Sequence, residues 1–149
     1  MTQALLRLKY RPDRQLASLM GTWLEDVYQE QGWNAGLVVP VPLNKHRRQR
    51  RGFNQAELLA DAFGRRAGLT VDSGRLIRVE DTRSQVGLNP HERWHNVRDA
   101  FIAKAQSFDN EDVLIVDDLF TTGATLSACA RAIKAAGARS VVGLAVARA

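Results

Sequence analysis

Apolar residues recur at helical spacing near the start of this 149-residue chain. Over residues 13–31 they fall three and four positions apart, which predicts a helix, and Gly32 follows as a natural stop. The stripe consists of Leu16, Leu19, Met20, Trp23, Leu24 and Val27. We interpret the whole stripe as core packing, which leaves no exposed apolar stripe to assign to an interface.

Two further segments have the same periodicity. Asn54 is a candidate N-cap, with Glu57 three positions on as in a capping box, and the helix should end near Gly68. Its predicted inward face is Ala56, Leu59, Ala60 and Phe63. A third helix is predicted over residues 124–136. Its inward face is Leu126, Cys129, Ala130 and Ile133.

Continuous apolar runs over residues 37–41, 113–116 and 140–147 predict buried strands. The second run, the helix after it and the third run form a strand–helix–strand unit, so we expect a mainly parallel sheet. Pro40 and Pro42 cannot donate to a ladder, so the first strand should end there or lie at an edge. Residues 76–79 predict a weak strand, and residues 5–10 a short strand or a helical turn.

Composition limits the kind of protein. The length suits one compact α/β domain, and no apolar run approaches the roughly 20 residues that span a bilayer. The N-terminus lacks a signal-peptide pattern, so we expect a cytoplasmic protein without a membrane partner. Cys129 is the one cysteine, which excludes a disulfide framework and a cysteine-based zinc site within the chain.

The net charge of +5 is unevenly distributed. Residues 45–51 read KHRRQRR, a cluster that attracts diphosphates, phosphates or nucleic acid. Charge alone leaves the alternative of a solvated surface loop open.

Residues 113–125 read VLIVDDLFTTGAT and combine the groups that a ribose 5-phosphate requires. Asp117 and Asp118 are predicted at the carboxyl end of a central strand, where parallel sheets bind ligands. Carboxylates accept hydrogen bonds from vicinal sugar hydroxyls. A phosphate suits the stretch that opens the next helix, because its glycine lets the backbone curl and the helix start attracts anions. That stretch is Thr121, Thr122, Gly123, Ala124 and Thr125.

Four other interpretations fit the motif less well. A response-regulator receiver domain would place its acid pair at the N-terminus, with a phospho-acceptor aspartate on a later strand. A Walker B strand would require a G-x-x-x-x-G-K-[ST] sequence, which the chain lacks. The motif could also be an ordinary strand-to-helix turn, or a relic without a ligand.

The thirteen residues resemble the motif that binds 5-phosphoribosyl-1-diphosphate (PRPP) in type I phosphoribosyltransferases. The resemblance implies that fold, a mainly parallel twisted sheet flanked by helices, as one domain with a core at 37–149 and an N-terminal hood at 1–36. It assigns the ribose hydroxyls to Asp117 and Asp118, and the 5-phosphate to the stretch 121–125. It places the diphosphate at the segment after the first core strand. The residues there are Arg47, Arg48, Arg50, Arg51 and Gly52.

The long polar segment at 82–97 corresponds to the loop that closes over PRPP in this family. Arg83 and Arg93 are therefore candidate catalytic residues, together with Asp117 and Asp118. We expect Mg²⁺ to be held mainly by PRPP itself, with Asp117 or Asp118 as a candidate ligand. Many relatives form dimers.

Residues 38–60 and 83–101 resemble the ComF/GntX group, which is associated with competence and DNA uptake. Many of its members begin with a four-cysteine zinc module that this sequence does not contain, so zinc is not expected. The resemblance implies a phosphoribosyltransferase-like protein with an unknown acceptor. The alternative is a non-catalytic protein that binds PRPP or a nucleotide and associates with single-stranded DNA.

Overall fold

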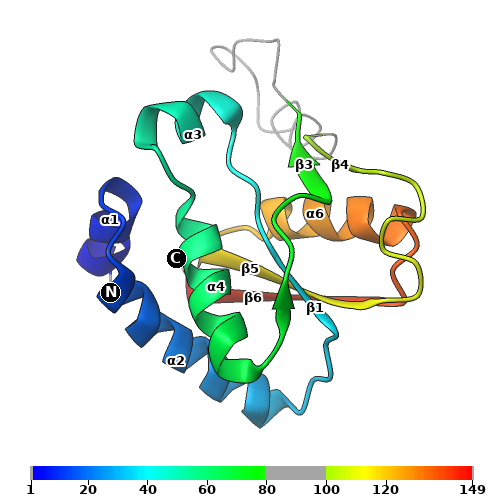
Figure 1. Ribbon diagram of the computed structural model, residues 1–149, viewed down its shortest axis with the longest axis horizontal. Coiled ribbons are helices and arrows are strands. Elements are labelled where there is room, and N and C mark those ends of the chain that lie inside the picture. The colour runs from blue at the N-terminus through cyan, green and yellow to red at the C-terminus, as the bar shows by residue number, and fades with distance from the viewer. Residues whose placement is uncertain (1, 80–99, 149) are drawn as a thin grey trace.

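The computed structural model describes residues 2–79 and 100–148 (Figure 1). The predicted loop at 82–97, with Arg83 and Arg93, lies outside the described residues. The elements in order are α1 (Thr2–Tyr10), α2 (Arg14–Gln31), β1 (Leu37–Pro40), α3 (Lys45–Arg51), α4 (Gln55–Ala67), β2 (Thr70–Val71), β3 (Leu76–Arg78), β4 (Phe101–Ala103), β5 (Asp112–Phe120), α6 (Ala124–Ala135) and β6 (Ser140–Arg148).

A four-stranded parallel sheet organises the molecule, in the order β2-β1-β5-β6. β3 and β4 form a separate antiparallel pair. Figure 1 shows α2 and α4 on one face of the main sheet and α6 on the other. This confirms the predicted α/β class, and β1 ends at its proline as expected.

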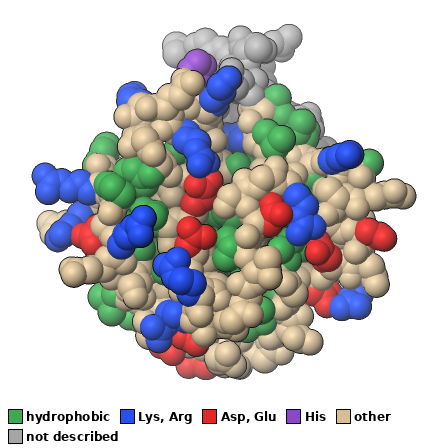
Figure 2. Space-filling view, viewed as in Figure 1, with side chains coloured by type: hydrophobic (Ala, Val, Ile, Leu, Met, Phe, Trp, Pro, Cys, Tyr) green, Lys and Arg blue, Asp and Glu red, His purple; other side chains and the backbone are tan. Residues whose placement is uncertain are grey.

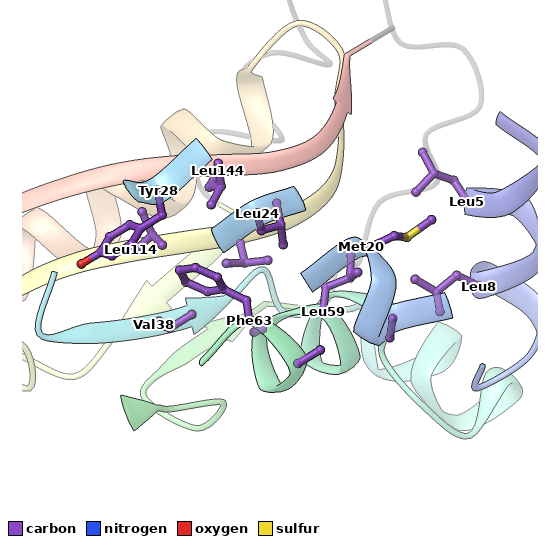
Figure 3. Close-up of a cluster of buried hydrophobic side chains, with 14 residues drawn as sticks. Leu5, Leu8, Met20, Leu24, Tyr28, Val38, Leu59, Phe63, Leu114 and Leu144 are labelled. Carbon is purple, nitrogen blue, oxygen red and sulfur yellow. The ribbon is translucent and has the colours of Figure 1, made fainter. Parts of the chain in front are cut away.

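Alternate side chains of β1 and β5 enter two apolar clusters, one on each face. Val38 and Leu114 pack with α2 and α4, whereas Val39 and Ile115 pack with α6. Figure 3 shows the first cluster, in which Phe63 of α4 contacts the strands. Both faces of these strands are buried, which explains their continuous apolar runs.

The predicted helix over 13–31 is confirmed, but its apolar stripe is only partly core. Asp13 caps α2 by accepting from the Leu16 N–H at 2.9 Å, and Gly32 ends it in a left-handed conformation. Helix α2 approaches α4 closely, since a Cβ on Gly21 would lie 3.0 Å from Ala62 Cβ. The buried face is Ala17, Met20, Gly21, Leu24 and Tyr28. Leu19, Trp23 and Val27 stay exposed, so the prediction that they pack in the core was wrong.

Of the two alternatives for residues 5–10, the helical one is confirmed: they belong to α1, in which Leu5 and Leu8 lie on one side and are buried. Another prediction required correction. β6 is a sheet edge in which only Leu144 is buried, so it is not the fully buried strand expected. β2 and β4 are too short for a detectable pattern. Among the described residues, no helix is long and apolar enough to cross a membrane.

Candidate functional site

The acid pair lies inside a strand and not beyond it. β5 continues to Phe120, because β6 keeps pairing with it: Asp117 is opposite Ala145, and Phe120 is opposite Arg148. The strand was expected to end at the acids, and it runs two residues further. Both carboxylates still lie near the carboxyl end of the sheet.

The loop after β5 opens directly into α6. Gly123 is the N-cap with φ of 79°, and a Cβ there would lie 3.0 Å from the Phe120 ring, so glycine is required. The N-cap provides no side-chain hydrogen bond, whereas Thr122 Oγ1 accepts from the Ala124 N–H at 3.3 Å. Thr121 and Thr122 are exposed. The N–H groups at the start of α6 and these hydroxyls form a suitable environment for a phosphate.

The two carboxylates differ in their surroundings. Asp118 is 7% exposed, and its Oδ2 accepts from Gln55 Nε2 at 3.4 Å. Asp117 Oδ1 accepts from the backbone N–H of Asp118 at 2.8 Å. Burial and the neighbouring Asp118 charge raise the pKa of Asp117 to about 7, against a smaller lowering by Lys9. The pair is therefore poised to gain a cation or a hydrogen-bond donor.

The basic segment forms a helix, α3, where a loop was expected. Asn44 accepts from the His46 N–H at 3.0 Å, and Gly52 ends the helix in the left-handed conformation. Lysine, arginine and glutamine are good helix formers, so two caps suffice for a short helix. No residue of α3 is buried.

The structure brings α3 and the acid pair together around one cavity of about 150 Å³. Of the five predicted diphosphate residues, Arg47 and Arg51 line this cavity. Arg48 pairs instead with Glu57 of α4. Arg50 and Gly52 are not among the lining residues. Of the predicted phosphate residues, Thr125 lines it, whereas Thr122 and Gly123 line a second cavity.

Three residues that line the cavity were not predicted from the sequence. Lys9 comes from α1, Gln55 from α4 and Arg78 from β3. None of the three had a predicted role, although Gln55 lies within the segment 38–60 that resembles the ComF/GntX group. Tertiary packing brings all three to the site. The N-terminal segment thus contributes a cation to the wall of the cavity.

Arg51 has an unusual environment. Its Nη1 donates to Gln55 Oε1 at 3.2 Å, and its guanidinium lies 5.9 Å from the Tyr10 ring centre. Its Nε is buried without a partner among the described residues. A buried N–H without a partner is costly, so this donor is available to a ligand.

Two acidic side chains, Asp117 and Asp118, and four cationic ones line the cavity. The cations are Lys9, Arg47, Arg51 and Arg78. On the face in Figure 2, Lys and Arg side chains are spread out, with acidic side chains between them. The described residues contain no group of three or more His, Cys, Asp or Glu side chains able to hold a metal ion. The arrangement suits a small ligand that carries both hydroxyls and several negative charges.

Comparison with known proteins agrees with this geometry. A profile of the family described as "Phosphoribosyl transferase domain" matches residues 13–148. Competence protein F of Haemophilus influenzae is 33% identical over 106 residues, which are 70% of this chain and 46% of that protein. Competence protein ComFC of Bacillus subtilis is 32% identical over 137 residues, 89% of this chain and 53% of that one.

The chain therefore spans about half the length of these curated relatives. Among solved structures, the glutamine PRPP amidotransferase of B. subtilis, complexed with ADP and GMP, superposes with a TM-score of 0.62. It is 19% identical, and the match covers 95% of this chain and 30% of that one. These findings confirm the resemblance to ComF-type phosphoribosyltransferases and the predicted fold.

Proposed function

Because the chain belongs to the phosphoribosyl transferase domain family, we propose that the cavity beside Asp117 and Asp118 binds PRPP together with Mg²⁺. The observation that carries the proposal is the meeting of the acid pair with Arg47 and Arg51 around a single cavity. PRPP carries a sugar diol and a diphosphate on adjacent carbons, so it needs both kinds of group at short range. A simple nucleotide would leave the arginines of α3 without a function.

The ribose and its 5-phosphate occupy the β5–α6 side in this proposal. Asp117 and Asp118 accept hydrogen bonds from the two ring hydroxyls. The 5-phosphate lies at the start of α6, where backbone N–H groups and the hydroxyls of Thr121, Thr122 and Thr125 donate to it. Gly123 allows the backbone to approach the phosphate closely.

The diphosphate lies against α3. Arg51 supplies the buried N–H that lacks a partner. Arg47, one turn earlier on α3, and Lys9 of α1 add charge to the wall of the cavity. Mg²⁺ arrives with the diphosphate, whose oxygens are the hard ligands that it prefers. One carboxylate of the acid pair is available to complete its coordination.

As a transferase, the chain would stabilise the departure of diphosphate from C1 of the ribose. The positive charge that develops on the ring resembles that in glycoside hydrolysis, and the acid pair lies where it can oppose that charge. The cations absorb the charge that develops on the leaving diphosphate.

Two relatives are named competence proteins, which supports a biological setting in competence, and we propose DNA uptake as the process. The second candidate, a binding protein that does not transfer the ribose and associates with single-stranded DNA, is favoured by the exposed cations of α3.

Calorimetry with PRPP and Mg²⁺ tests the binding proposal. Wild type should bind, and Asp117→Asn with Asp118→Asn should weaken binding by about 10-fold or more, because hydrogen bonds to charged groups contribute about 1.5–3 kcal/mol. Asp61→Asn, an exposed carboxylate on α4, is the matched control and should bind as wild type does. Undiminished binding by the double variant contradicts the ribose assignment.

A diphosphate-release assay separates the two candidate functions. Mg-PRPP is offered with a panel of nucleobases, amines and single-stranded DNA. Release that depends on one acceptor establishes a transferase. Binding without release supports the accessory role, and DNA binding should then weaken linearly with salt on logarithmic axes.

A further inference from the structure

Gln55, the first residue of α4, has a buried side-chain amide that joins the two halves of the candidate site. The residue is 6% exposed. Its Nε2 donates to Asp118 Oδ2 at 3.4 Å, and its Oε1 accepts from Arg51 Nη1 at 3.2 Å. Burying a long polar side chain costs hydration and rotamer freedom, so the partners that it reaches indicate its role.

The neighbouring Asn54 shows the contrast with a side chain that serves the scaffold. Asn54 accepts from the Ala56 N–H and donates to the Val41 carbonyl, so both of its bonds go to backbone and fix the start of α4 beside the end of β1. The side chain of Gln55 bonds to no backbone group among the described residues. It extends from a fixed helix start to two side chains of the site.

An amide is the group that this position requires. A carboxylate accepts hydrogen bonds and a guanidinium donates them, and an amide provides one acceptor and one donor group on the same carbon. A glutamate at position 55 would repel Asp118, and a lysine or arginine there would repel Arg51. The bridge between the two charges is therefore neutral and has one satisfied orientation.

The two charges that Gln55 bridges are not paired with each other. Elsewhere an arginine beside a carboxylate forms an ion pair, as Arg66 does with Glu25 at 2.7 Å. Arg51 and Asp118 are separated by one amide and its two hydrogen bonds, and each contacts the amide instead of the other. Opposite charges attract strongly in a partly buried site, so the amide occupies the space in which an ion pair would form.

The other neighbour of Arg51 is neutral as well. Its guanidinium lies 5.9 Å from the ring centre of Tyr10, a residue that is 72% exposed. The bonds of Gln55 are at the long end of the hydrogen-bond range. Arg51 is thus held by neutral groups and weak bonds, which an anionic ligand can replace at little cost.

We infer that Gln55 is a positioning residue that acts as a neutral spacer between Arg51 and Asp118. Without it, the arginine and the carboxylate pair directly. The ion pair then occupies the acceptor for the ribose hydroxyls and the donor for the diphosphate at the same time. The functional part of this inference rests on the proposed PRPP site, whereas the separation of the two charges does not.

Calorimetry with ribose 5-phosphate tests the functional part. Gln55→Ala should bind it about 10-fold more weakly, because the Arg51 guanidinium then occupies the Asp118 carboxylate. Adding Arg51→Gln should return the affinity to within about 3-fold of wild type, because the carboxylate is released. A variant that merely loosens the site would not recover when a second site residue is changed. Gln29→Ala, at an exposed glutamine of α2, is the matched control and should bind as wild type does.

Urea titration of the ligand-free protein tests the separation of charges without any ligand. Arg51→Gln should lower the unfolding midpoint more in the Gln55→Ala background than in wild type, because only there does Arg51 have an ion pair to lose. Gln55→Met keeps the length of the side chain and removes its polar groups. It replaces Gln55→Ala if that variant fails to fold, and the same signs are expected.

The two measurements separate this inference from the proposed function. A wild type that binds neither ribose 5-phosphate nor Mg-PRPP contradicts the proposed function, and the urea comparison still decides whether Gln55 keeps the charges apart. Undiminished binding of ribose 5-phosphate by the spacer variant, no recovery on adding Arg51→Gln, or equal midpoint shifts in both backgrounds overturns the inference.

Discussion

Helices α3 and α4 follow one another along the chain and are capped in the same way, yet they differ in what holds them. Each begins at an asparagine that accepts a backbone hydrogen bond and ends at a left-handed glycine. α4 buries seven residues in the core, whereas α3 buries none. Burial makes α4 part of the scaffold. The cations of α3 lie at the surface and at the cavity. Because core packing does not constrain its side chains, they are available to bind a ligand.

The largest effect should come from the buried face of α4. Phe63 is fully buried and lies 5.5 Å from the Tyr28 ring. Phe63→Ala should lower the free energy of unfolding by about 3–5 kcal/mol, through lost burial and the cavity left behind. Denaturant titration measures this. A loss below about 1 kcal/mol would mean that α4 is not the scaffold proposed.

The next effect concerns pH and the acid pair. The pKa of Asp117 is raised to about 7 from 3.8, so the folded state binds a proton more tightly than the unfolded state. Below about pH 4 the carboxyl is protonated in both states, so its burial does not lower the free energy of unfolding. Between about pH 4 and pH 7 the free energy of unfolding falls as the pH rises, and above pH 7 the loss is constant. Asp117→Asn should stabilise the ligand-free protein at pH 8 by on the order of a few kcal/mol, with no gain at pH 4. Equal stabilisation at both values would contradict this.

The two caps should differ in a measurable way. Asn54 is 2% exposed, accepts from Ala56 and donates Nδ2 to the Val41 carbonyl at 3.0 Å. Asn54→Ala should cost about 2–3 kcal/mol, since it removes a cap and leaves a buried carbonyl unpaired. Asn44→Ala should cost about 0.5–1 kcal/mol, because its bond is exposed. Equal costs would show that both helices depend on packing in the same way.

The smallest effect on stability should come from the cations of α3. Arg51→Gln should change the free energy of unfolding by less than about 0.5 kcal/mol. The same change should weaken Mg-PRPP binding about 10-fold, because it removes a charge-assisted donor from the cavity. Arg50→Gln is the matched control outside the cavity, and it should change neither quantity appreciably.

The contrast between the two helices also explains what the sequence could predict. Periodicity predicted α4 and its cap, because burial on one face imposes the spacing of Leu59 and Phe63. It could not predict that the basic segment is helical, since nothing in α3 is buried.

The candidate site divides in the same way. The motif predicted Asp117, Asp118 and the stretch 121–125, because one short segment contains them all. Lys9, Gln55 and Arg78 reach the cavity through packing of distant elements, which no local pattern encodes. For α2, the pattern predicted the helix but not its rotation, since the close approach at Gly21 decides which part of the stripe is buried.

The central claim is that the acid pair and α3 hold two parts of one ligand. Calorimetric titrations with Mg-PRPP, ribose 5-phosphate and Mg-diphosphate, each alone and in competition, test it most directly. The account predicts that both fragments bind and displace Mg-PRPP, that each binds more weakly than PRPP, and that Arg51→Gln weakens PRPP and diphosphate while sparing ribose 5-phosphate. If ribose 5-phosphate binds as tightly as PRPP and is equally weakened by Arg51→Gln, the two-part site is contradicted.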